Sequence, residues 1–278
     1  DQETWRSPAP LIWAGTGANA LTVYVTLWKD LASAFRARDV DKFAEVAKQI
    51  AAESKSHTAQ YVSPWRLSLE TFYNNMDFFT LALSLYVLSF LLYAAGQMVW
   101  PRPLYLASSG SLALGGLLHL TGLVMRVTIM ARPPVATLYE SIIFVSLIVI
   151  FFSLFLEKSK KNGVGVLMGS LAGSVLLFIA NRYQADGDTM GMLVAVLNTN
   201  FWLATHVVCI TIGYGCCFVG GLLGHIYLLQ QIAKPGQKAK TDEIYNNMVG
   251  VALVALFFSL FGTILGGIWA DQSWGRFW

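Results

Sequence analysis

Apolar residues in this 278-residue chain gather in six long runs, and a short polar segment separates each run from the next. A helix needs about 20 apolar residues to cross the roughly 30 Å hydrocarbon core of a bilayer. The six runs reach or approach that length; they are residues 78–99, 104–125, 141–156, 164–180, 201–229 and 248–268. The pattern predicts an all-α polytopic membrane protein with about six transmembrane helices.

The first quarter of the chain has a different pattern. Residues 29–60 carry charges of both signs around apolar positions such as Phe35 and Phe43, at the spacing of an amphipathic helix. This predicts a water-soluble helical hairpin outside the membrane. Residues 7–28 are uncharged but interrupted by prolines and glycines, which favours an extramembrane segment over a poor span. We therefore expect an extramembrane helical segment over 1–76 and a transmembrane domain over 77–278.

Composition and charge agree with several spans and exclude other classes. Hydrophobic residues make up 55% of the chain and charged residues only 13%, against about 25% charged in a soluble domain. The net charge is +3 with no basic run, so we expect no nucleic-acid partner. The three cysteines share one apolar segment, and no C-x-x-C-H haem-attachment motif is present. The chain is therefore not itself a c-type cytochrome.

The loops predict an orientation, because basic residues concentrate on the cytoplasmic side of membrane proteins. Six alternating spans place seven basic loop residues on one side: Arg102, Lys158, Lys160, Lys161, Lys234, Lys238 and Lys240. The other side has four, namely Arg126, Arg132, Arg182 and Arg276. The first side should be cytoplasmic, so the N-terminal segment and the tryptophan-rich end of the chain face outward.

A histidine and a tryptophan-rich segment are expected at the same outer face. His206 lies near the outer end of the fifth span, and the sixth span runs into "GGIWADQSWGRFW" with Trp269, Trp274 and Trp278. An imidazole can bind an iron while indole faces cover a macrocycle, and Arg276 can pair with a carboxylate of such a ligand. Trp274 and Trp278 are four residues apart, which predicts one face of a helix lying along the membrane surface. The alternative is a histidine bonded to a carbonyl beside an ordinary aromatic belt.

A further polar segment precedes the third span. In "RPPVATLYES" the two prolines stop the preceding helix, and Thr137 with Glu140 fits a capping box that opens the next one. Glu140 has Arg126 and Arg132 nearby, as an ion pair or as part of a polar site.

Two histidines within the spans also need an interpretation. His119 lies near the middle of the second span and His225 toward the cytoplasmic end of the fifth. Each is either a ligand of an intramembrane cofactor or, as the favoured interpretation, a helix–helix hydrogen bond.

Three segments together resemble a known family. "RPPVATLYES", "FWLATHVVCITIGYG" and "WADQSWGRFW" occur in the order found in CcsA-like proteins of cytochrome c maturation, and the last looks like the start of their WWD motif. The resemblance covers residues 77–278. The earlier "LWKDLASAF" and "LSLETFYNNMDFF" are similar to the region that joins CcsB-like and CcsA-like parts in fused members.

The resemblance implies a function in system II cytochrome c biogenesis. In this family haem b is presented at the outer, periplasmic face of the bacterial inner membrane and joined to the thiols of an apocytochrome C-x-x-C-H. The partners implied are that apocytochrome, a CcsB/ResB-like protein or fused domain, and thiol-reducing proteins. The chain would then be a component of a cytochrome c haem lyase. A haem transporter or chaperone without ligation activity remains an alternative, as does a quinone-binding or scaffold subunit.

By motif, the resemblance makes His206 an axial ligand of the haem iron. Trp269, Trp274 and Trp278 would line the platform with Arg276, and the secondary cofactor-binding candidates are His119, Arg126 and Glu140. The sequence stops before the Trp-Asp end of the motif and before the family's second outer histidine. Two alternatives follow: the rest of the site belongs to a separate segment, or the chain is a fragment of a longer protein such as a fused CcsB–CcsA protein.

Overall fold

A computed structural model describes residues 20–58, 63–184, 189–191, 199–233 and 236–276, and within these ranges it contains helices and no strands. The chain divides into two compact units, residues 1–68 and 69–278, with the division falling earlier than the predicted boundary at residue 76. Most of the predicted segment 7–28 lies outside the described residues, and its described part begins helix α2.

The first unit contains the predicted helical hairpin. Helix α2 (Ala20–Ala37) is joined to α3 (Val40–Thr58) by a tight turn in which Arg38 adopts a left-handed conformation with φ 56°. The side chain of Asp39 then accepts a hydrogen bond from the Lys42 amide (3.0 Å), which caps α3. Ala34 and Val46 are buried within the unit. The helical hairpin predicted over 29–60 is therefore confirmed.

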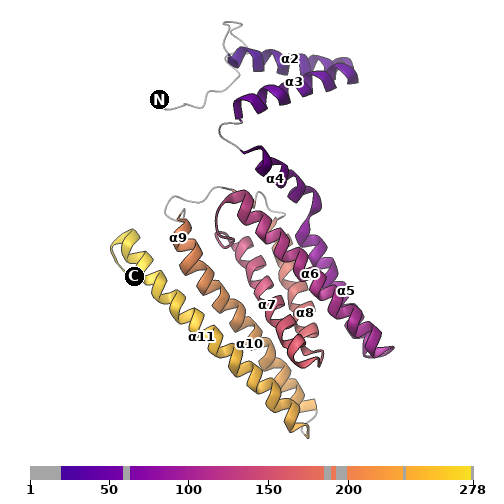
Figure 1. Cartoon of the computed structure of the whole chain (residues 1–278), viewed down its shortest axis with the longest axis vertical. Coiled ribbons are helices and arrows are strands. Elements are labelled where there is room, and N and C mark those ends of the chain that lie inside the picture. The colour runs from indigo at the N-terminus through magenta and orange to yellow at the C-terminus, as the bar shows by residue number, and fades with distance from the viewer. Residues whose placement is uncertain (1–19, 59–62, 185–188, 192–198, 234–235, 277–278) are drawn as a thin grey trace. The chain divides into compact units, whose positions relative to one another are not determined.

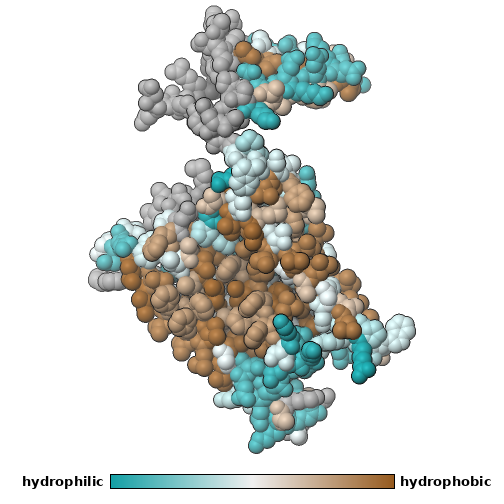
Figure 2. All heavy atoms as spheres, viewed as in Figure 1, coloured by the Kyte–Doolittle hydropathy of each residue, from teal (hydrophilic) through white to brown (hydrophobic). Residues whose placement is uncertain are grey.

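Six helices of the second unit are long and apolar enough to cross a membrane, which confirms the predicted number of spans. The elements from α4 onward are α4 (Pro64–Met76), α5 (Phe78–Gly96), α6 (Pro101–Met130), α7 (Leu138–Lys160), α8 (Val164–Gln184), α9 (Asn200–Trp202), a π-helical turn (Leu203–Val207), α10 (Val208–Ala233) and α11 (Lys238–Trp274). On the face that Figure 2 shows, a broad apolar area covers the middle of this unit and hydrophilic residues lie toward its ends.

The loops of this unit divide between its two ends as the alternation of spans predicts (Figure 1). The α5–α6, α7–α8 and α10–α11 connections lie at one end, which we call the lysine end because Lys158, Lys160 and Lys161 lie there. The α6–α7 loop, α9 and the end of α11 lie at the other, which we call the tryptophan end.

Close packing of the helices depends on small residues. Helices α5 to α8 pack together around Tyr86, Leu112 and Ile143, and α10 packs against α7 and α11. A Cβ atom added to Gly115 of α6 would lie 2.7 Å from the Tyr86 ring, so the two helices can approach only because this residue has no side chain.

Candidate functional site

His206 lies in the π-helical turn between α9 and α10. A π-helical turn contains one more residue than an α-helical turn, and such turns occur frequently at functional sites. The extra residue shifts the direction of every side chain that follows relative to those before it. The His206 side chain therefore points in a different direction from the one it would have in a regular α-helix.

A hydrogen bond to the neighbouring helix fixes the imidazole ring. Nδ1 of His206 lies 2.7 Å from the carbonyl oxygen of Gly262 in α11. A carbonyl only accepts hydrogen bonds, so Nδ1 carries the proton and donates. The lone pair of the neutral ring is then on Nε2, and no hydrogen bond to Nε2 is found within the described part of the chain. A histidine that binds a metal through one nitrogen commonly donates its other N–H to such an acceptor.

Two glycines of α11 provide the space for this arrangement. A Cβ atom at Gly266 would lie 2.6 Å from Cε1 of His206, and one at Gly262 would lie 2.9 Å from the backbone nitrogen of Ile210. Real Cβ atoms essentially never make contacts this short. The helices α10 and α11 therefore approach each other closely at the level of the histidine.

Aromatic rings flank the imidazole. The indoles of Trp202 and Trp269 are stacked, with centroids 6.3 Å apart and an interplanar angle of 11°. The His206 ring lies 5.7 Å from that of Trp269 at an angle of 60°. Phe201 meets the edge of Trp202 at 4.9 Å. A neutral imidazole nitrogen beside apolar aromatic faces fits the requirements of an iron porphyrin, which needs an axial donor and a surface to bury its ring.

The sequence singled out His206 and Trp269 but not Trp202. Trp202 precedes His206 by four residues, a spacing that puts two side chains on one helical face, and this signal is visible in "FWLATH". Within the described residues no group of three or more His, Cys, Asp or Glu side chains is placed to hold a metal ion. His206 is therefore not part of such a group among those residues.

The end of α11 differs from the prediction. The helix ends at Trp274, because Gly275 adopts a left-handed conformation with φ 68°. The prediction of one continuous helical face from residue 274 to 278 is therefore wrong, and Trp278 itself lies outside the described residues. Trp274 is 64% exposed, and Arg276 follows it as an exposed residue. The structure does not bring either of these two against His206.

A second polar cluster at the tryptophan end joins α6 to α7. One carboxylate oxygen of Glu140 accepts hydrogen bonds from Arg126 (3.1 Å) and Arg132 (3.3 Å). The other accepts from the backbone amides of Ala136 (2.8 Å) and Thr137 (3.2 Å), and the Thr137 hydroxyl accepts from the Glu140 amide. The predicted capping box is confirmed.

The two arginines of this cluster also hold the segment that follows α8. Arg126 donates to the Thr189 carbonyl (2.7 Å), and Arg132 donates to the Gly191 carbonyl (3.1 Å). Glu140 and Arg126 are fully buried, and the Arg126 guanidinium also lies over the Tyr139 ring. Of the two predicted alternatives for Glu140, the structure contains the ion pair, which the arginines make with Oε1. The backbone amides bind Oε2, so both carboxylate oxygens are engaged within the protein.

The histidines of the spans have different surroundings. His119 is completely buried, and its Nδ1 lies 3.1 Å from the Tyr86 hydroxyl of α5, which is the predicted helix–helix hydrogen bond. The edge of its ring meets Phe79. His225 is exposed, and its Nδ1 bonds the Gly221 carbonyl of its own helix (2.7 Å). The prediction of a helix–helix hydrogen bond for His225 is therefore wrong among the described residues, because its Nδ1 bonds a carbonyl one turn away in the same helix.

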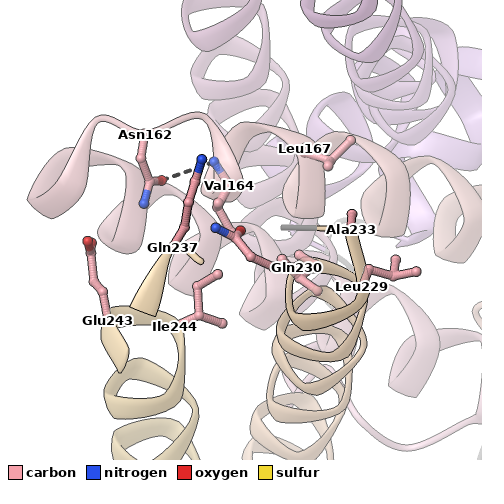
Figure 3. A pocket seen from close by; sticks show the side chains of 10 residues that line it. Asn162, Val164, Leu167, Leu229, Gln230, Ala233, Gln237, Glu243 and Ile244 are labelled. Carbon is pink, nitrogen blue, oxygen red and sulfur yellow. Dashed lines mark hydrogen bonds between the residues drawn. The ribbon is translucent and has the colours of Figure 1, made fainter. Parts of the chain in front are cut away.

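A cavity of about 430 Å³ lies at the lysine end, between the start of α8, the end of α10 and the start of α11. Figure 3 shows the amide side chains of Asn162, Gln230 and Gln237 around it. Glu243 lines the same cavity and pairs with Lys160 (3.7 Å). It contains no histidine or tryptophan, so it offers none of the groups that make the His206 site suitable for a porphyrin.

Comparisons with known proteins identify the family of the chain. A family model described as "Cytochrome C assembly protein" matches residues 135–278, which is slightly more than half of the chain and includes His206 and Trp269. Protein NrfI of Wolinella succinogenes is 32% identical over 165 residues, covering 58% of this chain and 18% of NrfI. Cytochrome c biogenesis protein CcsA of Chlamydomonas reinhardtii is 29% identical over 153 residues, covering 52% of this chain and 43% of that protein.

The CcsA protein of Guillardia theta is 24% identical over 169 residues, with 52% of this chain and 56% of that protein covered. The chain thus spans less than two thirds of the length of these three relatives. The six apolar helices indicate an integral membrane protein. The chain belongs to the cytochrome c assembly protein family, as a CcsA-type cytochrome c maturation protein.

Proposed function

We propose that this chain binds haem b at the tryptophan end and presents it for covalent attachment to an apocytochrome c. The observation that carries the proposal is the hydrogen bond from His206 Nδ1 to the Gly262 carbonyl, which leaves Nε2 as the metal-binding nitrogen beside Trp202 and Trp269. Haem is the substrate in this proposal. Membership of a cytochrome c assembly family supports haem handling in general.

The residues have separate tasks in the proposed site. His206 holds the iron from one side, and the Gly262 carbonyl maintains the tautomer and the ring orientation that this requires. The two stacked indoles exclude water from the macrocycle. Trp274, Arg276 and Trp278, which follow in the sequence, are proposed to extend the platform, with Arg276 pairing a haem carboxylate.

The chemistry joins two thiols of a C-x-x-C-H segment to the haem vinyl groups. Each sulfur bonds to one vinyl carbon while the thiol proton goes to the other, so no electrons are gained or lost. The thiols must be reduced beforehand, which accounts for a proposed thiol-reducing partner. Thioether formation is expected to need reduced iron, and the identity of an axial ligand such as His206 is one of the features by which a protein sets the redox state of a haem. The chain is therefore proposed as part of a cytochrome c haem lyase.

The proposed topology follows from charge. Because the lysine end carries more basic loop residues, we place it in the cytoplasm and the tryptophan end in the periplasm of a bacterial inner membrane. In this arrangement residues 1–76 form an extramembrane segment on the periplasmic side and residues 77–278 the transmembrane haem-handling domain. A CcsB/ResB-like protein or domain is the proposed partner beside the apocytochrome.

The test is covalent haem attachment in cells. The protein in its natural full-length form is co-expressed with a C-x-x-C-H reporter, and haem that survives denaturing electrophoresis is stained. We expect His206→Ala to abolish the stained reporter. His225→Ala is the matched control, because His225 is exposed and bonded within its own helix, and it should keep the signal.

Two other outcomes are informative. Haem that copurifies with the protein while no reporter is ever stained would indicate a haem transporter or chaperone rather than a lyase component. A reporter stained equally with His206→Ala and with His225→Ala would overturn the proposed role of His206.

A further inference from the structure

A second cavity at the lysine end differs from the one in Figure 3 in its charge. It has a volume of about 250 Å³ and lies where the α5–α6 turn meets the α7–α8 turn. Its lining combines two cationic side chains with amides and tyrosines: Tyr93, Gln97, Pro101, Arg102, Tyr105, Lys161, Asn162 and Gly163. At about 30 Å³ for each water molecule, it has room for a hydrated phosphate-sized group.

The two cations of this cavity, Arg102 and Lys161, make no direct ion pair within the described part of the chain. The nearby carboxylate of Glu157 is 5% exposed and engaged within the protein. Its Oε1 accepts from the Tyr105 hydroxyl and from the Gly163 amide (3.0 Å), while Oε2 accepts from the Val166 amide (3.2 Å). These donors are neutral, so Glu157 keeps its negative charge, but the two cations still outnumber this one buried carboxylate. A net positive charge is therefore left for an anion from outside.

Exposed hydrophobic side chains adjoin the lining residues of the cavity in the sequence. The α5–α6 turn exposes three consecutive hydrophobic side chains, Met98 (87%), Val99 (54%) and Trp100 (72%). Leu106, one helical turn after Arg102 in α6, is 67% exposed. A cationic cavity with an apolar surface running from it into the span matches a lipid, whose charged headgroup and acyl chains need these two environments side by side.

We propose that this cavity binds the phosphodiester headgroup of an anionic phospholipid. Arg102 and Lys161 contact the phosphate, Gln97 and Asn162 offer amide donors, and the acyl chains lie along the exposed apolar surface that includes Leu106. Basic cavities between helices near the membrane surface are known to select anionic headgroups. The bound lipid would join the α5–α6 turn to the α7–α8 turn.

Native mass spectrometry of the purified full-length protein tests this proposal. The protein is incubated in neutral detergent with phosphatidylglycerol or with phosphatidylcholine, and the retained lipids are counted. The test variant carries Arg102→Gln and Lys161→Gln. The control carries Lys158→Gln and Lys238→Gln, which removes two charges from the same end without touching the cavity.

We expect phosphatidylglycerol to bind the wild type and the control, and to bind the test variant roughly 30-fold more weakly, at about fivefold for each cation lost near the surface. Arg102→Lys with Lys161→Arg keeps the charge and should retain binding, which separates lost contacts from misfolding. Equal retention of both lipids, or equal binding by the test and control variants, would overturn the proposal. Displacement of the lipid by millimolar inorganic phosphate would also overturn it, because the cavity would then be a site for free phosphate.

Discussion

A methyl group added to Gly266 should disable the proposed haem site without unfolding the protein. The new Cβ of Gly266→Ala would lie 2.6 Å from Cε1 of His206, whereas ordinary contact begins at 3.4 Å. The imidazole must therefore move by about 0.8 Å, the difference between these two distances. Such a movement would lengthen the 2.7 Å bond to Gly262 beyond the usual 3.2 Å limit and displace Nε2 by a similar amount.

The effect on stability should be small, because two contributions oppose each other. A lost hydrogen bond costs about 0.5–1.5 kcal/mol, while replacing glycine by alanine inside a helix stabilises it by about 1 kcal/mol. The net change in the free energy of unfolding is therefore expected within about 1 kcal/mol of zero. The haem site should respond far more strongly, since an axial bond does not tolerate a displacement near 1 Å.

The assay is the reduced-minus-oxidised absorption spectrum of the purified full-length protein, expressed per mole of protein and measured with its thermal unfolding. Gly250→Ala is the matched control, because it adds the same methyl group to the same helix where nothing lies within 4 Å. We expect Gly266→Ala to lose or alter the haem bands while Gly250→Ala retains them. Identical spectra for the two variants would refute the geometry assigned to His206.

Three further substitutions test the packing that supports the site, each by thermal unfolding in detergent. Glu140→Gln should destabilise the protein by about 3–5 kcal/mol, because it leaves two buried arginines without their carboxylate; a loss below 1 kcal/mol would contradict this. Tyr105→Phe removes a donor to the buried Glu157 carboxylate and should cost about 1–3 kcal/mol, whereas an unchanged melting temperature would argue against that bond. Gly165→Ala should be severely destabilising, since its new Cβ would overlap the backbone oxygen of Ser153 in α7. Gly220→Ala should be tolerated, because no other atom lies within 4 Å of its new Cβ, and equal effects of the two substitutions would contradict the packing.

Features that depend on local sequence were predicted well. The six spans follow from the length of apolar runs, which the bilayer thickness fixes independently of packing. The capping box of Thr137 and Glu140 depends on residues three apart and formed as expected. The pairing of Glu140 with Arg126 and Arg132 was one of two alternatives that the sequence left open, and the structure contains it.

Features that depend on non-local geometry were predicted less well. Trp202 joins the site by stacking on Trp269 of α11, a contact between residues 67 positions apart that its four-residue spacing from His206 does not reveal. Gly262 and Gly266 of α11 act on His206 across a contact between two helices. His206 and Gly262 are 56 residues apart in the sequence, so no local pattern reveals their contact. The expected face of Trp274 and Trp278 was wrong, because Gly275 ends the helix before that face can form.

The haem ligand itself decides the central claim. The full-length protein with His206→Gly is purified beside the wild type and beside His225→Gly, and dithionite-reduced spectra are recorded with and without added imidazole. The account predicts that His206→Gly loses or alters the wild-type haem spectrum, that imidazole restores it, and that His225→Gly matches the wild type. A haem spectrum indifferent to His206, or a wild type without a Soret band even after haem is supplied, would contradict it.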